Sequence, residues 1–238
     1  MNNFMDIELR KKLIIAADDY GIRETSKPIL DLAEKGILDR VAVFPELVAD
    51  DDMRALLSTG VEIDIHLELM HLLKSGYEDT GGAFSRGMNF LFRRIFGKVN
   101  KEKARVEWRR QIISFRERFG RLPDGLNSHE HVHYFPEFFS VIAELAREFG
   151  IGYVRLGSRG IIRGRHGRLT SQILASCAQS DRKVLLANER ESSEWVTSFD
   201  WFADQDEFMS IVSKPEYSNI EVVFHPERSD EKQALESW

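Results

Sequence analysis

The stretch KLIIAADDYG, residues 12–21, contains the pattern from which the fold is predicted. Five apolar residues, Leu13 to Ala17, run without interruption and end at Asp-Asp-Tyr-Gly. A short continuous apolar run is typical of a strand buried on both faces of a parallel sheet, and the polar residues after it indicate a turn. Residues 28–35 then show helix-like spacing, with Pro28 in the first turn and Gly36 as the stop. This stretch therefore predicts a strand that is followed by a helix.

The same alternation of apolar runs and helical patterns continues along the chain. Further strands are expected at RVAVF (40–44), VEIDIHL (61–67), DGLN (124–127), IGYVRL (151–156), DRKVLLA (181–187) and NIEVVFHP (219–226). The clearest helices are expected at 101–119 and 136–149, each followed by a glycine. Alternating strands and helices indicate a parallel sheet with helical crossovers. The expected fold is α/β, an irregular or incomplete (β/α) barrel of the TIM type, with a doubly wound open sheet as the alternative.

Composition limits the class of protein. The 238 residues are 42% hydrophobic and 30% charged, which is enough for one substantial core. We expect a single domain over residues 1–238 with an irregular insertion at about 70–98, where glycines interrupt aromatic and basic residues. The formal net charge of -6 argues against a nucleic-acid binder, although basic residues cluster at 92–98 and 159–168.

The cysteine count and the hydropathy of the sequence indicate the cellular compartment of the protein. The chain has one cysteine, Cys177, so an internal disulfide and a thiolate zinc site are excluded. Residues 1–12 lack the apolar core of a signal segment, and no stretch approaches the roughly 20 apolar residues that span a bilayer. These features predict a cytoplasmic protein without a membrane span.

Acidic residues and histidines follow several of the expected strands. Asp18 and Asp19 follow the first strand, His66 ends the third, His129 follows DGLN, and His225 ends the last. The carboxyl ends of parallel strands meet at one edge of a sheet or barrel, where active sites form. The residues therefore predict one cleft, in which one carboxylate could bind a metal while the other accepts a proton. Taken singly, the aspartates also fit a helix-capping turn, and His66 also fits a hydrogen-bonded core residue.

The stretch NSHEHVHYFP, residues 127–136, carries His129, His131 and His133 at every second position. A strand rises about 3.3 Å per residue, so His129 and His133 would lie about 13 Å apart in an extended segment. Three histidines in that form cannot easily bind one small cation, whereas two of them can. The remaining ones would face a substrate or support the ligands.

The motifs AADDYG, DIHLEL, NSHEHVHYFP and VVFHPE, in this order and at these intervals, resemble those of the YdjC-like, or ChbG-like, carbohydrate deacetylase family. The resemblance covers most of the chain and is weaker at 70–98 and 158–215. It implies a barrel-like deacetylase fold and one divalent cation held by an aspartate and two histidines. By position, these ligands are Asp19, His66 and His129.

The resemblance also implies further roles. Asp18 would be the catalytic base, and His225 would lie beside the site as a proton donor or as a group that steadies the intermediate. His131, His133 and Arg155 would bind the sugar or buttress the ligands, with packing or surface roles as the alternative. Zinc suits an oxygen and nitrogen ligand set by affinity, whereas magnesium would retain several waters, so Mg or Zn is expected.

Four residues that flank these motifs depart from the family pattern. The chain has Ala16, Asp64, Asn127 and Glu227 where family members commonly have Asn, Gly, Asp and Gly. The candidate ligands are retained, whereas hydrogen-bonding and turn residues around them differ. The departures therefore bear on substrate and catalytic efficiency more than on the metal site.

The expected function is removal of an N-acetyl or similar N-acyl group from a small amino sugar or oligosaccharide. One alternative is a metal-dependent phosphoesterase or amidohydrolase, although these usually carry the His-x-His pair just after the first strand. Another is a catalytically silent carbohydrate- or metal-binding protein, which the altered flanking residues keep open. The phenylalanine-rich insertion is compatible with a homodimer interface.

Overall fold

The computed structural model describes residues 7–22, 24–69 and 100–238. The insertion expected at about 70–98 lies outside the described residues. The strands are β1 (Leu13–Tyr20), β2 (Arg40–Val43), β3 (Glu62–Leu67), β4 (Gly125–Ser128), β5 (Tyr153–Val154), β6 (Gly160–Ile161), β7 (Trp195–Ser198) and β8 (Ile220–Phe224). The α-helices are α1 (Ile7–Arg10), α2 (Ser26–Glu34), α3 (Asp50–Thr59), α5 (Lys101–Phe119), α6 (Pro136–Phe149), α7 (Arg168–Ala187), α8 (Gln205–Val212) and α9 (Ser229–Glu236).

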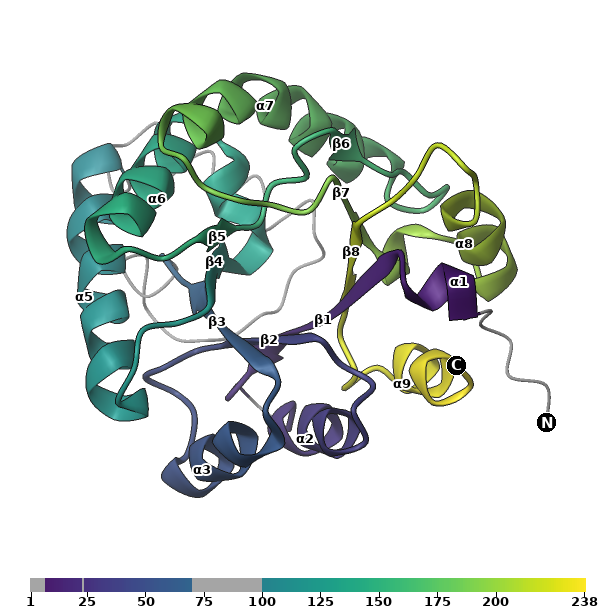
Figure 1. Ribbon diagram of the computed structural model, residues 1–238, viewed down its shortest axis with the longest axis horizontal. Helices are drawn as coiled ribbons and strands as arrows, with labels where there is room; N and C mark the ends of the chain where they lie inside the picture. Colours follow the sequence, from purple (N-terminus) through teal and green to yellow (C-terminus); the bar gives the residue numbers. More distant parts are fainter. Residues whose placement is uncertain (1–6, 23, 70–99) are drawn as a thin grey trace.

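The eight strands form one parallel sheet in the order β5-β4-β3-β2-β1-β8-β7-β6. Figure 1 shows that the sheet curls around a central axis, with the helices on its outside. No strand ladder joins β5 to β6 among the described residues. Backbone hydrogen bonds to residues 191–193 cross this gap: Val154 N donates to the carbonyl of Glu191 (2.9 Å), and Ser158 N donates to that of Ser193 (2.8 Å). Because β5 and β6 do not pair in the described part of the chain, the barrel is incomplete, and the prediction of an incomplete α/β barrel is confirmed.

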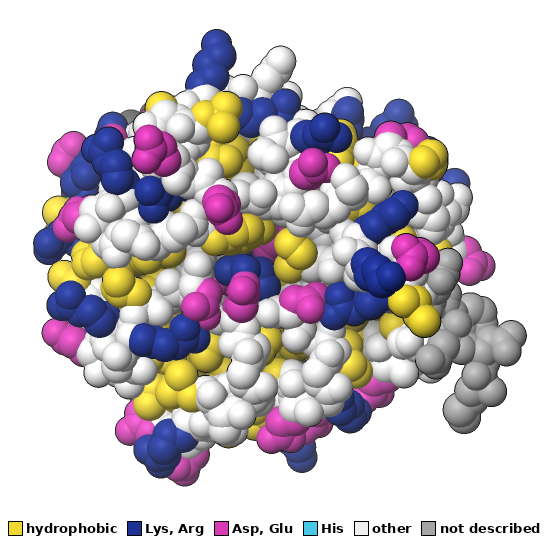
Figure 2. Space-filling model, viewed as in Figure 1, with side chains coloured by type: hydrophobic (Ala, Val, Ile, Leu, Met, Phe, Trp, Pro, Cys, Tyr) yellow, Lys and Arg dark blue, Asp and Glu magenta, His cyan; other side chains and the backbone are white. Residues whose placement is uncertain are grey.

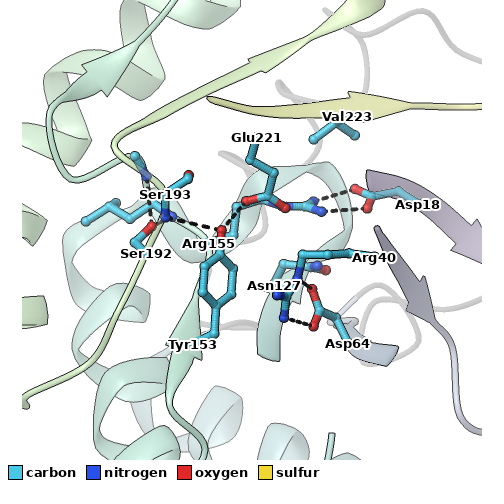
Figure 3. Close-up of polar contacts among 12 residues, drawn as sticks. Asp18, Arg40, Asp64, Asn127, Tyr153, Arg155, Ser192, Ser193, Glu221 and Val223 are labelled. Carbon is cyan, nitrogen blue, oxygen red and sulfur yellow. Dashed lines mark hydrogen bonds and ion pairs between the residues drawn. The ribbon is translucent and has the colours of Figure 1, made fainter. Parts of the chain in front are cut away.

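Side chains alternate between the outer and inner faces of the barrel wall, as β3 illustrates. Ile63 and Ile65 are buried in the hydrophobic core beneath the helices. Asp64 and His66 are equally buried but point the other way, toward polar partners on neighbouring strands. The alternation in VEIDIHL thus predicted the strand correctly, and the barrel interior is lined in part by charged side chains (Figure 3).

One predicted strand is wrong. Residues 181–187 form the end of α7, in which Leu174, Ala178 and Leu185 lie buried along one face. The apolar run at 184–186 is too short to distinguish a buried strand from a buried helix turn, and the helical spacing upstream decides between them. Two short strands, β6 and β7, were not expected; β6 has only two residues and β7 only four.

The described surface agrees with the composition. Basic and acidic side chains are interspersed over the face seen in Figure 2, and both kinds lie at the centre of that face. No helix among the described residues is long and apolar enough to cross a membrane.

Candidate metal centre and its surroundings

Asp19, His66 and His129 meet at the carboxyl ends of β1, β3 and β4. Asp19 Oδ1 lies 3.2 Å from His66 Nε2 and 3.0 Å from His129 Nδ1. One donor atom from each of the three residues lies within 4.8 Å of the other two. This is the group that the resemblance implied as ligands, and one small cation could contact all three.

The backbone of Asp19 explains how two successive aspartates serve the same edge. In a regular strand their side chains would point to opposite faces. Asp19 instead has φ 69°, and the pairing with β2 shifts register between Ala17 and Tyr20. A left-handed conformation is uncommon for a residue with a side chain, and it often marks a functional site. Here Thr25 supports the conformation, since its hydroxyl donates to the Asp19 carbonyl at 2.5 Å.

His66 is oriented by Asn127, its direct neighbour in the pairing of β3 with β4. His66 Nδ1 donates to Asn127 Oδ1 at 2.5 Å, which leaves Nε2 as the nitrogen that faces Asp19. Metal-ligating histidines usually have their second nitrogen fixed in this way. Phe44 forms an apolar wall beside the centre. Its ring packs edge-on against those of His66 and His129, with ring centroids 4.9 and 5.5 Å apart.

The electrostatics of the group favour a positive charge next to Asp19. Burial alone would raise the pKa of Asp19, but hydrogen bonds and charge from His129 and His66 hold that pKa well below its usual range. Burial would likewise lower the pKa of His129, and the Asp19 carboxylate instead raises it to about 9. A divalent cation could take the place of the proton that Asp19 holds on His129, so the donors fit a metal by chemistry as well as by distance.

Asp18 turns into the barrel and is held by a buried arginine (Figure 3). Arg155 Nη1 and Nη2 donate to its two oxygens at 2.7 and 2.9 Å. The same guanidinium donates from Nε to Glu221 Oε1 at 2.7 Å, and the Tyr153 hydroxyl donates to Glu221 Oε2 at 2.6 Å. Burial would raise the pKa of Asp18, but Arg155, then His66 and His225, lower it below its usual range. Asp18 is therefore an oriented carboxylate at neutral pH.

The histidine-rich stretch is not extended: His129–Tyr134 form a short 3-10 helix that is kinked at Glu130 and His131. Glu130 and His131 have φ of 53° and 55°, so the chain turns sharply after His129. His131 lies between the rings of Tyr134 and Trp201, with ring centroids 5.8 and 6.0 Å away. Burial, and then the charge of Arg155, lower the pKa of His131 to about 4.

His133 makes hydrogen bonds with both ring nitrogens inside the protein. Its Nε2 donates to the carbonyl of Arg155 at 2.9 Å, and the Ser128 hydroxyl donates to its Nδ1 at 2.7 Å. Burial lowers the pKa of His133 well below its usual value, so the ring is neutral. The sequence left two roles open for His133 and Arg155, sugar binding or support of other site residues. Both side chains use their polar groups in hydrogen bonds within the protein, which is the supporting role.

His225 directly follows β8, and its side chain is 18% exposed. Its backbone N donates to Glu231 Oε2 at 2.7 Å. Sequence reasoning missed Glu221, Tyr153 and Glu231 as parts of this region. The signal for Glu221 was an acidic residue inside an otherwise apolar strand, whereas nothing in the sequence singled out the other two.

The chain is similar in sequence to a known protein family and to several named proteins. A sequence model of the family described as YdjC-like protein matches residues 12–237. A carbohydrate deacetylase from Danio rerio is 27% identical over 154 residues, which cover 61% of this chain and 49% of that protein. A chitooligosaccharide deacetylase from Escherichia fergusonii is 26% identical over 149 residues, covering 60% and 58%. A Homo sapiens carbohydrate deacetylase is 26% identical over 202 residues, covering 80% and 62%. The chain therefore spans between about half and two thirds of the length of these relatives.

Solved structures support the fold. A protein from Enterococcus faecalis, described as a candidate cellobiose-phosphate cleavage protein, superposes with a TM-score of 0.60 at 22% identity over 90% of this chain and 80% of that one. A lactam utilization protein from Thermus thermophilus gives a TM-score of 0.56 at 12% identity over 94% of each chain. At these identities the likeness concerns the fold alone.

Proposed function

The chain belongs to the YdjC-like protein family, and from this membership we propose that it is a metal-dependent hydrolase that removes N-acetyl or similar N-acyl groups from an amino sugar or oligosaccharide. The named deacetylases among its relatives support the substrate class. The observation that carries the proposal is the adjacency of two different aspartates. One oxygen of Asp19 contacts both His66 and His129, whereas both oxygens of Asp18 accept hydrogen bonds from Arg155.

We assign Asp19, His66 and His129 as the residues that would hold one divalent cation, either Mg or Zn. Their donor set of one carboxylate oxygen and two imidazole nitrogens suits a catalytic site in which further positions remain for water and substrate. When bound, the cation would polarise the acyl carbonyl and lower the pKa of a water molecule. Asn127 would keep His66 in the tautomer that such binding requires.

Asp18 is the proposed general base. Its carboxylate is ionised at neutral pH, and Arg155 fixes both of its oxygens, so it can accept the proton of the attacking water from a defined position. Glu221 in turn fixes Arg155, because a buried guanidinium needs its charge and its donors satisfied, and the Tyr153 hydroxyl fixes Glu221. In this assignment Arg155 and His133 position other groups and do not contact the sugar.

His225 is the proposed proton donor. An amine leaves a tetrahedral intermediate readily only when its nitrogen gains a proton as the C–N bond breaks. His225 is partly exposed at the same end of the barrel as Asp18, and its charge is among those that lower the Asp18 pKa. The half-buried His131 would border the sugar, next to Trp201.

The proposal is tested by incubating the protein with Mg or Zn and a panel of N-acetylated mono- and oligosaccharides, and by measuring acetate and free amine together. We expect equal amounts of both products from at least one sugar, and none after chelation. Asp230, which is exposed on α9, gives a matched control, since Asp230→Asn should retain the wild-type rate. Cleavage of a phosphodiester without acetate release from any sugar would replace the proposal with a phosphoesterase. Sugar binding without any turnover would replace it with a binding protein.

A further inference from the structure

Glu231 is a buried carboxylate close to His225 that the proposed reaction has not yet used. It is the third residue of α9, and only 1% of its surface is exposed. Acidic side chains are rarely buried to this extent without a partner. Its Oε2 accepts the backbone N–H of His225 at 2.7 Å and lies 3.9 Å from His225 Nδ1.

Helix capping does not account for this contact. In a capping box, the acidic residue at the third helical position bonds the backbone N–H of the N-cap residue, which here is Arg228. The bond instead reaches three residues farther back, to His225, at the end of β8. The contact therefore ties the start of α9 to a strand-end histidine of the candidate site.

Both oxygens of Glu231 are held. Arg228 Nη1 donates to Oε1 at 2.9 Å, and the same atom donates to Asp200 Oδ2 at 3.0 Å. Asp200 is fixed in turn by the Ser198 hydroxyl at the end of β7, at 2.6 Å. A carboxylate locked on both sides can orient a neighbouring ring more strictly than a free surface carboxylate can.

His225 has one ring nitrogen that needs a partner. Its Nδ1 is buried and makes no hydrogen bond within the described part of the chain, while Glu231 Oε2 is its nearest anionic atom. The charge of His225 also lowers the pKa values of Asp18 and Asp200. The 3.9 Å separation is too long for a hydrogen bond but within ion-pair distance, so a small rotation of the ring would form a bond from Nδ1 to Glu231.

We propose that Glu231 is a positioning residue that orients and electrostatically supports protonated His225 as the proton donor to the departing amine. This inference rests on the proposed deacetylase function. With Nδ1–H turned to Glu231, Nε2–H is the proton that can be delivered. As the C–N bond breaks, its electron pair forms an N–H bond with that proton, His225 becomes neutral, and Glu231 remains a carboxylate. The proton that Asp18 took from water then restores His225, directly or through solvent, so the balance is one water consumed per amide cleaved.

Burial supports the same view of Glu231. Desolvation raises the pKa of Glu231 to about 7, and the charge of His225, its backbone N–H and Arg228 are what hold it from rising further. Because burial disfavours the ionised form of Glu231, a positive charge beside it stabilises that form, and protonated His225 supplies such a charge.

The experiment compares Glu231→Gln with Asp230→Asn, which removes an exposed acid from the same first turn of α9. Two substrates are used: an N-acetyl sugar that the wild type turns over, and 4-nitrophenyl acetate, whose leaving group departs without a proton. For E231Q we expect kcat on the sugar to fall about 10- to 100-fold, with KM changed less than about threefold. The rate on the aryl ester, the metal content and the Tm should stay near those of the wild type, and D230N should match the wild type throughout.

The double variant His225→Gln/Glu231→Gln provides a second check. Because Glu231 acts through His225, the double variant should lose no more kcat on the sugar than His225→Gln alone. Equal activity of E231Q and wild type on the sugar would overturn the inference. So would a parallel loss of sugar and ester turnover together with metal, since that would indicate a structural role. If the wild type released no acetate from any sugar, the proposed function would fail first and this inference with it.

Discussion

Removing Arg155 should destabilise the protein strongly and in a pH-dependent way. Arg155→Met keeps an unbranched apolar side chain but deletes three N–H donors, two to Asp18 and one to Glu221. The side chains of Arg155 and Glu221 are 0% exposed and that of Asp18 is 4% exposed, so water cannot replace the lost charge. In the variant, Asp18 would lose the cation that is hydrogen-bonded to it, and among the described residues Glu221 would retain only Tyr153 as a side-chain hydrogen-bond partner.

The magnitude follows from the protonation of these carboxylates. A carboxyl group with an unfolded pKa near 4 takes up a proton at pH 7 at a cost of about 4 kcal/mol, so two such groups cost at most about 8 kcal/mol. Loss of one partner of a buried ion pair typically costs about 3–5 kcal/mol. We therefore expect R155M to lower the free energy of unfolding by about 4–8 kcal/mol at pH 7, a large share of the roughly 5–15 kcal/mol of a typical domain.

The sign of the pH dependence is fixed by the same groups. In the wild type, the lowered pKa of Asp18 gives stability that is present above its unfolded pKa and lost as pH falls through the folded pKa. In R155M the folded pKa of Asp18 would lie above the unfolded one, so its contribution to stability would be present at low pH and lost as pH rises. The difference in the free energy of unfolding between the two proteins should therefore shrink by up to about 1.4 kcal/mol per pH unit, through Asp18, on going from pH 7 to pH 5.

Urea denaturation at pH 5, 6 and 7, followed by far-UV circular dichroism, measures these values. Exposed Arg163→Met is the matched control and should change the free energy of unfolding by less than about 0.5 kcal/mol. The double variant Arg155→Met/Glu221→Gln removes one of the stranded charges and should recover about half of the loss. A loss below about 1 kcal/mol in R155M, or a loss independent of pH, would refute the reasoning.

Three further predictions concern the metal centre and the core. Asn127→Ala removes the acceptor that orients His66, so calorimetric titration should give a cation affinity about 10- to 100-fold weaker, and an unchanged affinity would contradict that role. Because a cation must displace the proton that Asp19 holds on His129, affinity should rise about tenfold per pH unit up to about pH 9 and then level off; a flat profile between pH 6 and 8 would exclude this competition. Buried Asp181 has an Oδ2 without a hydrogen-bond partner in the described structure, and burial raises its pKa to about 7. Stability is thus lost as pH rises from about 4 to about 7, so Asp181→Asn should be more stable than wild type by up to about 4 kcal/mol at pH 8 and by little at pH 4, as checked by urea denaturation.

The elements that the sequence predicted are those whose apolar spacing is unambiguous. Residues 12–17 and 136–149 show an apolar run and a helical stripe, and they form the expected strand and helix, although β1 continues to Tyr20 where a turn was expected. Residues 181–187 misled because three consecutive apolar side chains fit either a strand or a helix turn, and only the upstream packing of α7 decides.

The shared position of the candidate ligands could be predicted because each lies near the end of an expected strand, and parallel strands bring their carboxyl ends together. The choice of these three residues came from the family resemblance. The partners of the site residues could not be predicted. Arg155 and Asp18 are 137 residues apart, and their contact depends on strand order and register across the barrel, which one sequence does not contain. Likewise, the left-handed backbone at Asp19 and at Glu130 was not predictable, since neither is a glycine.

The division of labour between Asp18 and Asp19 is tested most directly by measuring bound metal and acetate release in Asp18→Asn and Asp19→Asn, after both variants have been loaded with the same cation and dialysed. We predict that Asp18→Asn retains one cation per chain and releases no acetate from a sugar that the wild type hydrolyses, whereas Asp19→Asn retains neither metal nor activity. A full equivalent of tightly bound cation in Asp19→Asn, or wild-type turnover by Asp18→Asn, would contradict the assignment.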